Sequence, residues 1–391
     1  MKILLTSDWY IPAVNGVVAS VLNLSKGLKE RGHEVRILTL SQTHRSYVQD
    51  GVTYIGSLPA GIVYPGARLR AALSKKEIRE LLEWRPDVVH SNCEFSTFLL
   101  ARKIAVRLDV PLIHTYHTVY ENYTHYFSPS KQWGRKMVKT LTRHIAAQTD
   151  CLIAPTQKVK NLLCDYHVFQ PVCVVPTGIE QERFQPQGGD AGREAMREKL
   201  GIPTGHTVLV FVGRLAKEKN CGELLKAVFG FRHEAVTLLI VGDGPCRREL
   251  ERQAESLGLG GQVIFTGMVP PEEVGRYYHA ADLFVSASAS ETQGLTYLEA
   301  LSCGLPMLCR RDECLRGVLL DGVNGWQYGT EEEFSDRLKI FLENPGIRSE
   351  LSCEAARIGR GFSISSFAEN AEQVYREQIV LRQMLKQEAS A

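Results

Sequence analysis

The sequence predicts an α/β protein made of two Rossmann-like domains, each with a parallel sheet covered by helices. A chain of 391 residues is long for one hydrophobic core and natural for two. Its 44% apolar and 23% charged residues are typical of a globular protein. Short apolar runs alternate with amphipathic segments along the chain, and strands separated by helices form parallel sheets with right-handed crossovers.

The first series of elements lies within residues 1–186, the predicted N-terminal domain. Its expected strands are Lys2–Thr6, Glu34–Thr39, Asp87–His90, Leu112–Tyr116, Cys151–Ala154 and Val172–Val175. Its expected helices are Val17–Arg31, Lys75–Trp84 and Thr97–Leu108. The polar segment Gln185–Gly192 contains three glycines, so we predict that it links the two domains.

The second series occupies residues 187–365, the predicted C-terminal domain. Its expected strands are Thr207–Val212, Thr237–Val241, Val263–Thr266, Leu283–Ala287 and Met307–Cys309. Helices are expected near 221–230, 245–257, 271–280 and 331–343. The last segment, Ser365–Glu388, has the pattern of a long amphipathic helix.

Charge and cysteine content exclude several classes of function. A formal net charge of +2 gives no basic excess for nucleic-acid binding. The N-terminus has too few consecutive apolar residues for a signal peptide, and no apolar run approaches the ~18–20 residues of a membrane span. Ten cysteines occur without C-x-x-C or zinc spacing, which favours reduced thiols and a cytoplasmic protein.

The most informative motif is Glu291-Thr-Gln-Gly-Leu-Thr-Tyr-Leu-Glu299, which follows a predicted strand and opens a predicted helix. Ligands of open α/β sheets bind at the carboxyl ends of the strands, where Glu291 would lie. A helix starting near Gly294 presents free N–H groups and its positive dipole end to an anion. Glu299 is placed to accept hydrogen bonds from a vicinal diol. The motif therefore combines sugar, phosphate and ribose contacts.

A second motif, Val212-Gly-Arg-Leu-Ala-Lys-Glu-Lys219, follows the first strand of the second domain. Arg214 and Lys219 lie in a strand-to-helix loop, where they would neutralise the charge of a leaving diphosphate. Neither a Walker A loop nor an Asp-x-Asp motif occurs, so cationic side chains and helix dipoles must meet that charge without a metal.

With these motifs, the chain resembles the retaining glycosyltransferases of family 4 over essentially its whole length. The resemblance implies the GT-B fold, two facing Rossmann-like domains with a deep cleft between them and a C-terminal helix that returns to the first domain. It assigns Glu291 to the donor sugar and Glu299 to the ribose, with Gln293, Gly294 and Leu295 also on the donor side. Arg214 and Lys219 become the phosphate clamp.

Further donor contacts follow from glycine-rich loops. Gly16 follows the first strand in Asn15-Gly-Val17, where the family usually has two glycines. Gly242 and Gly244 lie in Val241-Gly-Asp-Gly-Pro245, which resembles a dinucleotide fingerprint except that Arg247 replaces the third glycine. We interpret that loop as a turn positioning the nucleotide. The resemblance adds backbone contacts to the nucleobase from Thr266, Gly267 and Met268.

In the first domain, His114-Thr-Tyr-His-Thr118 ends a strand. His117 matches a family histidine that contacts the donor sugar and supports catalysis, whereas His114 is expected to be structural. Glu94, after another strand, is a weaker candidate. The aromatics Tyr120, Tyr123 and Tyr126 recur at three-residue intervals and are similar to the H-T-x-Y-E-x-Y-x-H-Y pattern of bacterial 1,2-diacylglycerol 3-glucosyltransferases.

The following segment has the pattern of a basic amphipathic helix. Trp133, Met137, Val138, Leu141 and Ile145 fall within an arc of roughly 140° on a helical wheel. The remaining surface carries Lys131, Arg135, Lys136, Lys139 and Arg143, and no acid interrupts them. Docking on an anionic membrane, worth about 1 kcal/mol per base, and ordinary packing on the domain core both fit this pattern.

These features predict a cytoplasmic enzyme on the inner face of the cell membrane that moves a hexose from a nucleotide sugar, UDP-glucose by resemblance, to diacylglycerol. We expect retention of configuration by a front-face reaction, with no cofactor and no metal. A covalent route through Glu291 is open chemically. The alternatives are a soluble acceptor, such as a saccharide or thiol-cofactor precursor, a nucleotide-sugar epimerase, an NAD-dependent oxidoreductase and a lipid-binding scaffold without activity.

Overall fold

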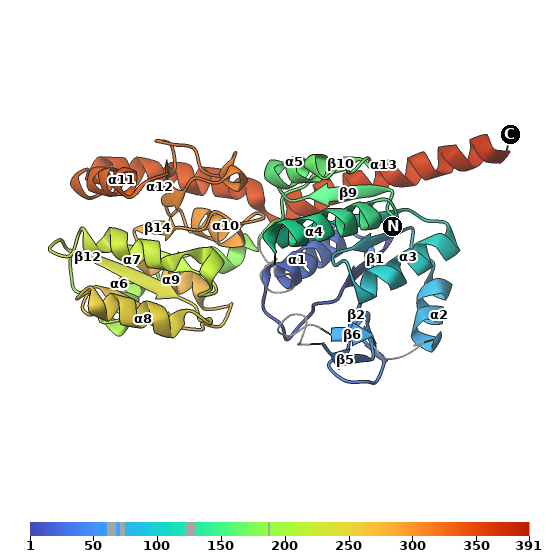
Figure 1. The fold of residues 1–391 in the computed structure, drawn as a ribbon, viewed down its shortest axis with the longest axis horizontal. Helices are drawn as coiled ribbons and strands as arrows, with labels where there is room; N and C mark the ends of the chain where they lie inside the picture. Colours follow the sequence, from blue (N-terminus) through green and yellow to red (C-terminus); the bar gives the residue numbers. More distant parts are fainter. Residues whose placement is uncertain (61–67, 71–74, 122–129, 187, 391) are drawn as a thin grey trace. The chain divides into compact units, whose positions relative to one another are not determined.

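A computed structural model describes residues 1–60, 68–70, 75–121, 130–186 and 188–390 (Figure 1). The chain divides into two compact units. The first contains Met1–Gly178 and the C-terminal segment Ile364–Ala391, and the second contains Ile179–Ser363. Each unit is an open parallel sheet with helices on both faces, the GT-B building plan that the sequence predicts.

The first unit has a sheet in the order β10-β9-β8-β7-β1-β2-β4-β3, parallel except for the edge strand β3. Its strands are β1 (Lys2–Ser7), β2 (Glu34–Leu40), β3 (Tyr47–Gln49), β4 (Val52–Ile55), β7 (Val88–Ser91), β8 (Leu112–Thr115), β9 (Cys151–Ala154) and β10 (Val172–Val174), with a separate hairpin of β5 (Ser57–Pro59) and β6 (Arg68–Arg70). Its helices are α1 (Gly16–Glu30), α2 (Lys75–Trp84), α3 (Ser96–Leu108), α4 (Lys131–Ala146), α5 (Gln157–Asp165) and α13 (Ile364–Ser390).

Alternating side chains of the central strand β1 divide between the two faces of this sheet, as the pleat requires. Ile3 and Leu5 pack in a cluster with α1 and α13, whereas Leu4 packs with α2, α3 and Ile145 of α4. Helices α2, α3 and α4 therefore share one face, and α1 and α13 share the other.

The C-terminal helix α13 is an integral part of the first unit. It packs so closely on α1 that a Cβ atom on Gly27 would lie 2.7 Å from Ile364 Cγ2. Glu372 accepts hydrogen bonds from Arg31 and Arg376, and Arg382 forms ion pairs with Asp109 and Asp150. A glycine in α1 and charged partners along α13 thus fix the return of the chain.

The second unit has a fully parallel sheet in the order β13-β12-β11-β14-β15-β16. Its strands are β11 (Thr207–Val212), β12 (Val236–Val241), β13 (Val263–Gly267), β14 (Leu283–Ser286), β15 (Met307–Arg310) and β16 (Gly325–Tyr328). Its helices are α6 (Gly189–Lys199), α7 (Cys221–Phe229), α8 (Arg247–Ser256), α9 (Val274–Ala280), α10 (Leu295–Ser302), α11 (Glu331–Glu343) and α12 (Pro345–Gly359). Two apolar clusters, one on each face, form its core.

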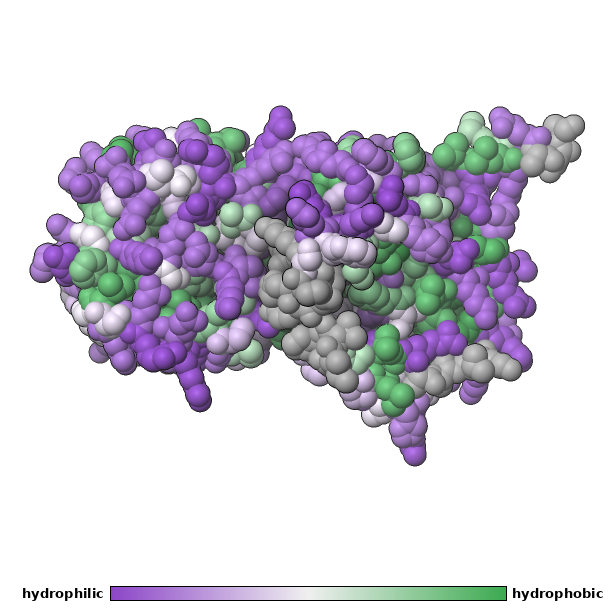
Figure 2. All heavy atoms as spheres, viewed as in Figure 1, coloured by the Kyte–Doolittle hydropathy of each residue, from purple (hydrophilic) through white to green (hydrophobic). Residues whose placement is uncertain are grey.

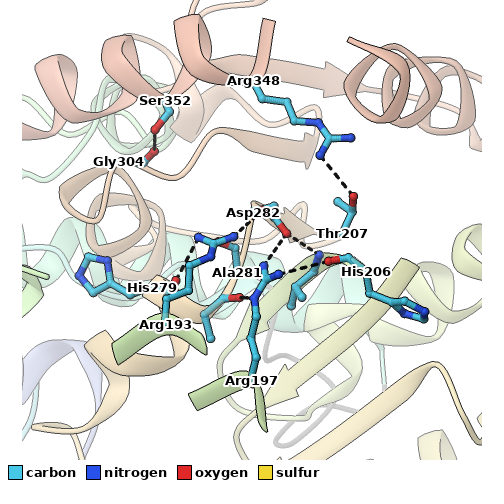
Figure 3. A network of polar contacts seen from close by, with 12 residues as sticks. Arg193, Arg197, His206, Thr207, His279, Ala281, Asp282, Gly304, Arg348 and Ser352 are labelled. Atoms are coloured by element: carbon cyan, nitrogen blue, oxygen red, sulfur yellow. Dashed lines mark hydrogen bonds and ion pairs between the residues drawn. The ribbon is translucent and has the colours of Figure 1, made fainter. Parts of the chain in front are cut away.

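The predicted linker Gln185–Gly192 is wrong, because it lies inside the second unit and includes the start of α6. Figure 3 shows the reason: Arg193 and Arg197 of α6 bind both carboxylate oxygens of Asp282, at 2.5 and 2.7 Å. The same guanidinium groups donate to backbone carbonyls of residues 279–281 at the end of α9. These long-range contacts hold α6 on the second unit, and with it the polar, glycine-rich residues at its start, which composition alone assigns to a linker.

Candidate active site

In the second unit, the loops after β11 and β12 lie so close together that their backbones form hydrogen bonds with each other. The N–H of Gly213 donates to Val241 O, and the N–H of Leu215 donates to Asp243 O. A Cβ atom on Gly242 would lie 2.0 Å from Gly213 O, and one on Gly244 would lie 2.4 Å from Leu215 O. These two glycines are therefore required where the loops meet, before any nucleotide is considered.

The same edge of the sheet brings together one residue from each of the two motifs, Val212–Lys219 and Glu291–Glu299. Lys219 Nζ forms an ion pair with Glu291 Oε1, and both side chains are largely buried. The hydroxyl groups of Ser288 and Ser290 also donate to Glu218 O, which ties the loop after β14 to the loop after β11. Arg214, by contrast, is exposed. A cation and a carboxylate that lie 72 residues apart in sequence thus form one charged site.

The N-cap of α10 is Gly294, whose φ of 74° is in the left-handed region and which has no side chain to cap the helix. Gln293 is buried, and Leu295 begins the helix. One turn further on, Glu299 Oε2 accepts a hydrogen bond of 2.8 Å from the buried Tyr278 hydroxyl. Desolvation raises the pKa of Glu299, and Tyr278 counters this rise. The helix therefore places its N-terminus and a restrained carboxyl group within about one turn of each other.

The predicted nucleobase contacts lie at the end of β13. The carbonyl of Gly267 accepts hydrogen bonds from Gly242 N–H and from the Thr266 hydroxyl. The Met268 side chain is exposed. The Gly267 carbonyl is thus engaged within the protein, and any base contact here must come from other atoms of this turn.

In the first unit, Gly16 is the first residue of α1, and the side chain of Asn15 caps the helix by accepting from Val18 N–H at 3.0 Å. This explains the departure from the paired glycines of family 4. An asparagine cap satisfies one of the free N–H groups that a second glycine would leave open.

His117 follows β8, and its Nε2–H donates to Asn92 Oδ1 at 3.0 Å. Burial, with a smaller contribution from His114, lowers the pKa of His117 to about 3. The imidazole is therefore neutral at physiological pH. The sequence did not single out Asn92, although its place just after β7 is the same signal that pointed to His117.

Three further titratable side chains gather at the carboxyl ends of the adjacent strands β1, β7 and β8. Asp8 Oδ1 accepts from Thr97 N–H and so caps α3, and burial raises the pKa of Asp8 to about 6. Glu94 Oε2 accepts from the Tyr120 hydroxyl, and Glu94 Oε1 lies 3.6 Å from His114 Nε2.

Several buried atoms of this cluster have no hydrogen-bond partner among the residues that the structure describes. They are Asp8 Oδ2, Glu94 Oε1 and both ring nitrogens of His114. Asp8 was not among the predicted site residues and Glu94 was a weaker candidate, although both acids follow predicted strands in the sequence. Two carboxyl groups with free acceptor oxygens form a polar cluster suited to hydroxyl donors.

The predicted aromatic and basic region is described only in part. Tyr120 lies edge-on to Phe95 and Tyr116, while Tyr123, Tyr126 and the Lys131 side chain lie outside the described residues. The apolar arc expected for α4 is divided into a buried part and an exposed part. Val138 and Ile145 are buried in the core, whereas Trp133, Met137 and Leu141 are 41–70% exposed and form an i, i+4, i+8 row.

The bases of α4 are also not equivalent. Arg135 pairs with Glu121 at 2.8 Å, and Lys139 donates to the carbonyl of Asp165. Lys136 and Arg143 are exposed. The helix therefore packs on the core and also presents an apolar row flanked by bases to solvent. Within the described residues, no helix is long and apolar enough to cross a membrane.

Comparison with known proteins identifies the family. Residues 14–183 match the family described as Glycosyltransferase Family 4, and residues 192–358 match Glycosyl transferases group 1. A relative from Streptococcus pneumoniae (strain R6), named alpha-monoglucosyldiacylglycerol synthase, is 34% identical over 97% of this chain and 86% of its own length. A D-inositol 3-phosphate glycosyltransferase from Xylanimonas cellulosilytica is 30% identical over 92% of this chain and 91% of its own length.

Solved structures agree on the fold. The Anabaena protein Alr3699/HepE, determined in complex with UDP, has a TM-score of 0.74 and 17% identity, and the alignment covers 96% of this chain and 100% of that one. Together with the two parallel-sheet units, these similarities establish that the chain belongs to the family 4 glycosyltransferases and has the GT-B fold.

Proposed function

We propose that this glycosyltransferase moves glucose from UDP-glucose to diacylglycerol at the surface of a membrane, with retention at the anomeric carbon. The observation that carries the lipid acceptor is the exposed row Trp133, Met137 and Leu141 beside Lys136 and Arg143, in a chain similar over nearly its full length to a glucosyldiacylglycerol synthase. Exposed apolar residues flanked by bases fit the interface of an anionic bilayer.

The donor-side chemistry follows from the charged site of the second unit. Arg214, Lys219 and the N-terminus of α10 would stabilise the leaving diphosphate without a metal. Glu291, held by Lys219, would bind sugar hydroxyls, and Glu299 would bind the ribose diol. The loops carrying Gly242, Gly244 and residues 266–268 would shape the nucleotide site.

The first unit would supply the remaining groups. Gly16 lies at the start of α1, where N–H groups favour a phosphate. His117, neutral and oriented by Asn92, would bind a donor-sugar hydroxyl. In a front-face reaction, the bond between the anomeric carbon and the diphosphate oxygen breaks while the acceptor oxygen attacks from the same side. The departing oxygen takes the acceptor proton, so no protein nucleophile is required.

The decisive experiment measures UDP release from UDP-glucose with and without diacylglycerol in anionic vesicles, together with lipid extraction. We expect release that depends on diacylglycerol and one new glycolipid with an α-linkage by NMR. Release with no lipid product, or activity only with GDP- or ADP-sugars, would contradict the assignment.

A soluble acceptor is the second candidate, favoured by the similarity to an enzyme named for D-inositol 3-phosphate. The same assay with D-inositol 3-phosphate in place of lipid separates the two. Release with neither acceptor but with conversion of the nucleotide sugar itself would indicate an epimerase.

A further inference from the structure

A second helix beside α4, α3, also presents exposed apolar side chains. On α3, Leu99 is 62% exposed and Val106 67% exposed, and Phe95 at the start of the helix is also exposed. At about 100° per residue, these three side chains fall within an arc of about 40°. Figure 2 shows hydrophobic side chains among hydrophilic ones over this helix.

The flanks of this apolar row are basic. Arg102 lies on one side and Lys103 and Arg107 on the other, all of them exposed, and α3 contains no acidic residue. Within the described residues, no carboxylate forms an ion pair with these three bases. The face of α3 is therefore narrow, apolar and flanked by unneutralised cations.

Helices α3 and α4 lie on the same face of the first sheet, because Ile145 of α4 shares a core cluster with Phe98 and Ala101 of α3. Together they contain eight of the 46 basic residues and none of the 44 acidic ones, so the rest of the chain has an excess of six acids. Positive charge is thus concentrated on this pair of helices, although the molecule as a whole is nearly neutral.

We infer that the outer face of α3 is a second membrane-docking surface, which inserts Leu99 and Val106 at the interface of an anionic bilayer beside the exposed row of α4. The inference rests on the proposed lipid acceptor. Charge complementarity selects the occupant. A second copy would bring two basic faces together, and a nucleic acid would leave the apolar row uncovered.

The test is flotation of the full chain with vesicles of phosphatidylcholine alone or mixed equally with phosphatidylglycerol, without sugar nucleotide. We expect wild type to float only with the anionic vesicles. Leu99→Ser with Val106→Ser should weaken binding about tenfold, from the loss of buried apolar area. Arg102→Gln with Lys103→Gln and Arg107→Gln should weaken it tenfold or more.

Two matched controls define the baseline. Phe169→Ser removes an apolar side chain that is 92% exposed elsewhere in the first unit. Arg248→Gln with Arg252→Gln and Lys339→Gln removes three exposed bases of the second unit. Both should float like wild type, and circular dichroism should show every variant folded.

Flotation of both α3 variants like the controls would overturn the inference. Loss of vesicle binding in the charge variant alone would also overturn it, because it would indicate a general polyanion site. A change from dimer to monomer in Leu99→Ser/Val106→Ser would overturn it as well, because it would indicate a second copy as the occupant. Trp133→Ser with Met137→Ser reports on α4 separately. Glucose transfer to diacylglycerol in nonionic detergent should be unchanged in the α3 variants. If wild type shows no such transfer, the proposed function is contradicted, while the flotation result still decides the docking surface.

Discussion

The acidic side chains of the two units differ in how many of their carboxylate oxygens have a hydrogen-bond partner. In the second unit, Lys219 holds Glu291 and Tyr278 holds Glu299. In the first unit, Asp8 Oδ2 and Glu94 Oε1 are buried without a hydrogen-bond partner among the described residues. Among the described residues of the second unit, Ser302 Oγ is the one buried side-chain atom without a partner. Burying an unpartnered polar atom costs roughly 1–3 kcal/mol, so the first unit carries the larger cost.

This difference fits a division of labour. A donor side that recognises one nucleotide sugar benefits from charges held in fixed positions. Free acceptor oxygens in the first unit would be satisfied by the hydroxyl groups of an acceptor, and we expect them to matter for acceptor binding. Four variants test this contrast, from the largest expected effect to the smallest.

The largest effect is expected for Lys219→Ala. It removes the cation proposed to face the diphosphate and breaks the ion pair with Glu291, so kcat should fall about 10²–10³-fold. Steady-state kinetics with UDP-glucose measure the loss. Lys217→Ala, an exposed base in the same loop, is the control and should keep wild-type kcat. Full activity of Lys219→Ala would refute the charge-stabilisation account.

Glu94→Gln tests the free oxygen of the first unit. It keeps the size of the side chain and an acceptor for Tyr120, and we expect KM for the acceptor to rise about tenfold with little change in KM for UDP-glucose. Tyr120→Phe, which removes the donor to Glu94, separates positioning from direct binding. An unchanged acceptor KM in Glu94→Gln would indicate a purely structural role.

Asp8→Asn tests how much the buried Asp8 carboxylate lowers the stability of the fold, because this destabilisation depends on pH. Because burial raises the pKa of Asp8 to about 6 in the folded protein, its carboxyl group destabilises the fold increasingly as pH rises from about 4 to 6. Asparagine can still accept from Thr97. We expect Asp8→Asn to raise stability by about 1–3 kcal/mol at pH 7.5 and to have little effect at pH 4.

Thermal unfolding at the two pH values measures this difference. An equal change in Tm at both would show that the carboxyl group is not destabilised in the fold. Loss of acceptor turnover in a stabilised Asp8→Asn would be the expected trade-off for a functional group.

The smallest effect is expected for Tyr278→Phe, which removes the hydrogen bond to Glu299 and preserves the packing of the ring. We expect KM for UDP-glucose to rise a few-fold, about 1 kcal/mol, with kcat nearly unchanged. An unaltered KM, with acceptor KM raised instead, would reverse the assignment of the two units.

The alternation of apolar runs with amphipathic segments was sufficient to place the main strands almost to the residue, because buried parallel strands are continuous apolar runs. Five strands in the described part of the chain were missed. Strands β3, β5 and β6 are three residues long and largely exposed. Strands β4 and β16 are mostly buried, but each has only four residues, so their apolar runs are short. For the site, local motifs predict Arg214, Lys219, Glu291 and Glu299, because both motifs follow a strand and contain a glycine at the turn.

Tertiary structure decided which of these groups meet. The pairing of Lys219 with Glu291 and the cluster of Asp8, Glu94 and His114 join residues from different strands, and no local pattern encodes strand order. The same holds for α4, where periodicity predicted one apolar arc and only packing on the sheet separated buried Val138 from exposed Met137. Sequence sets the apolar period of a helix, whereas the neighbours that cover part of that face determine which of its apolar side chains stay exposed.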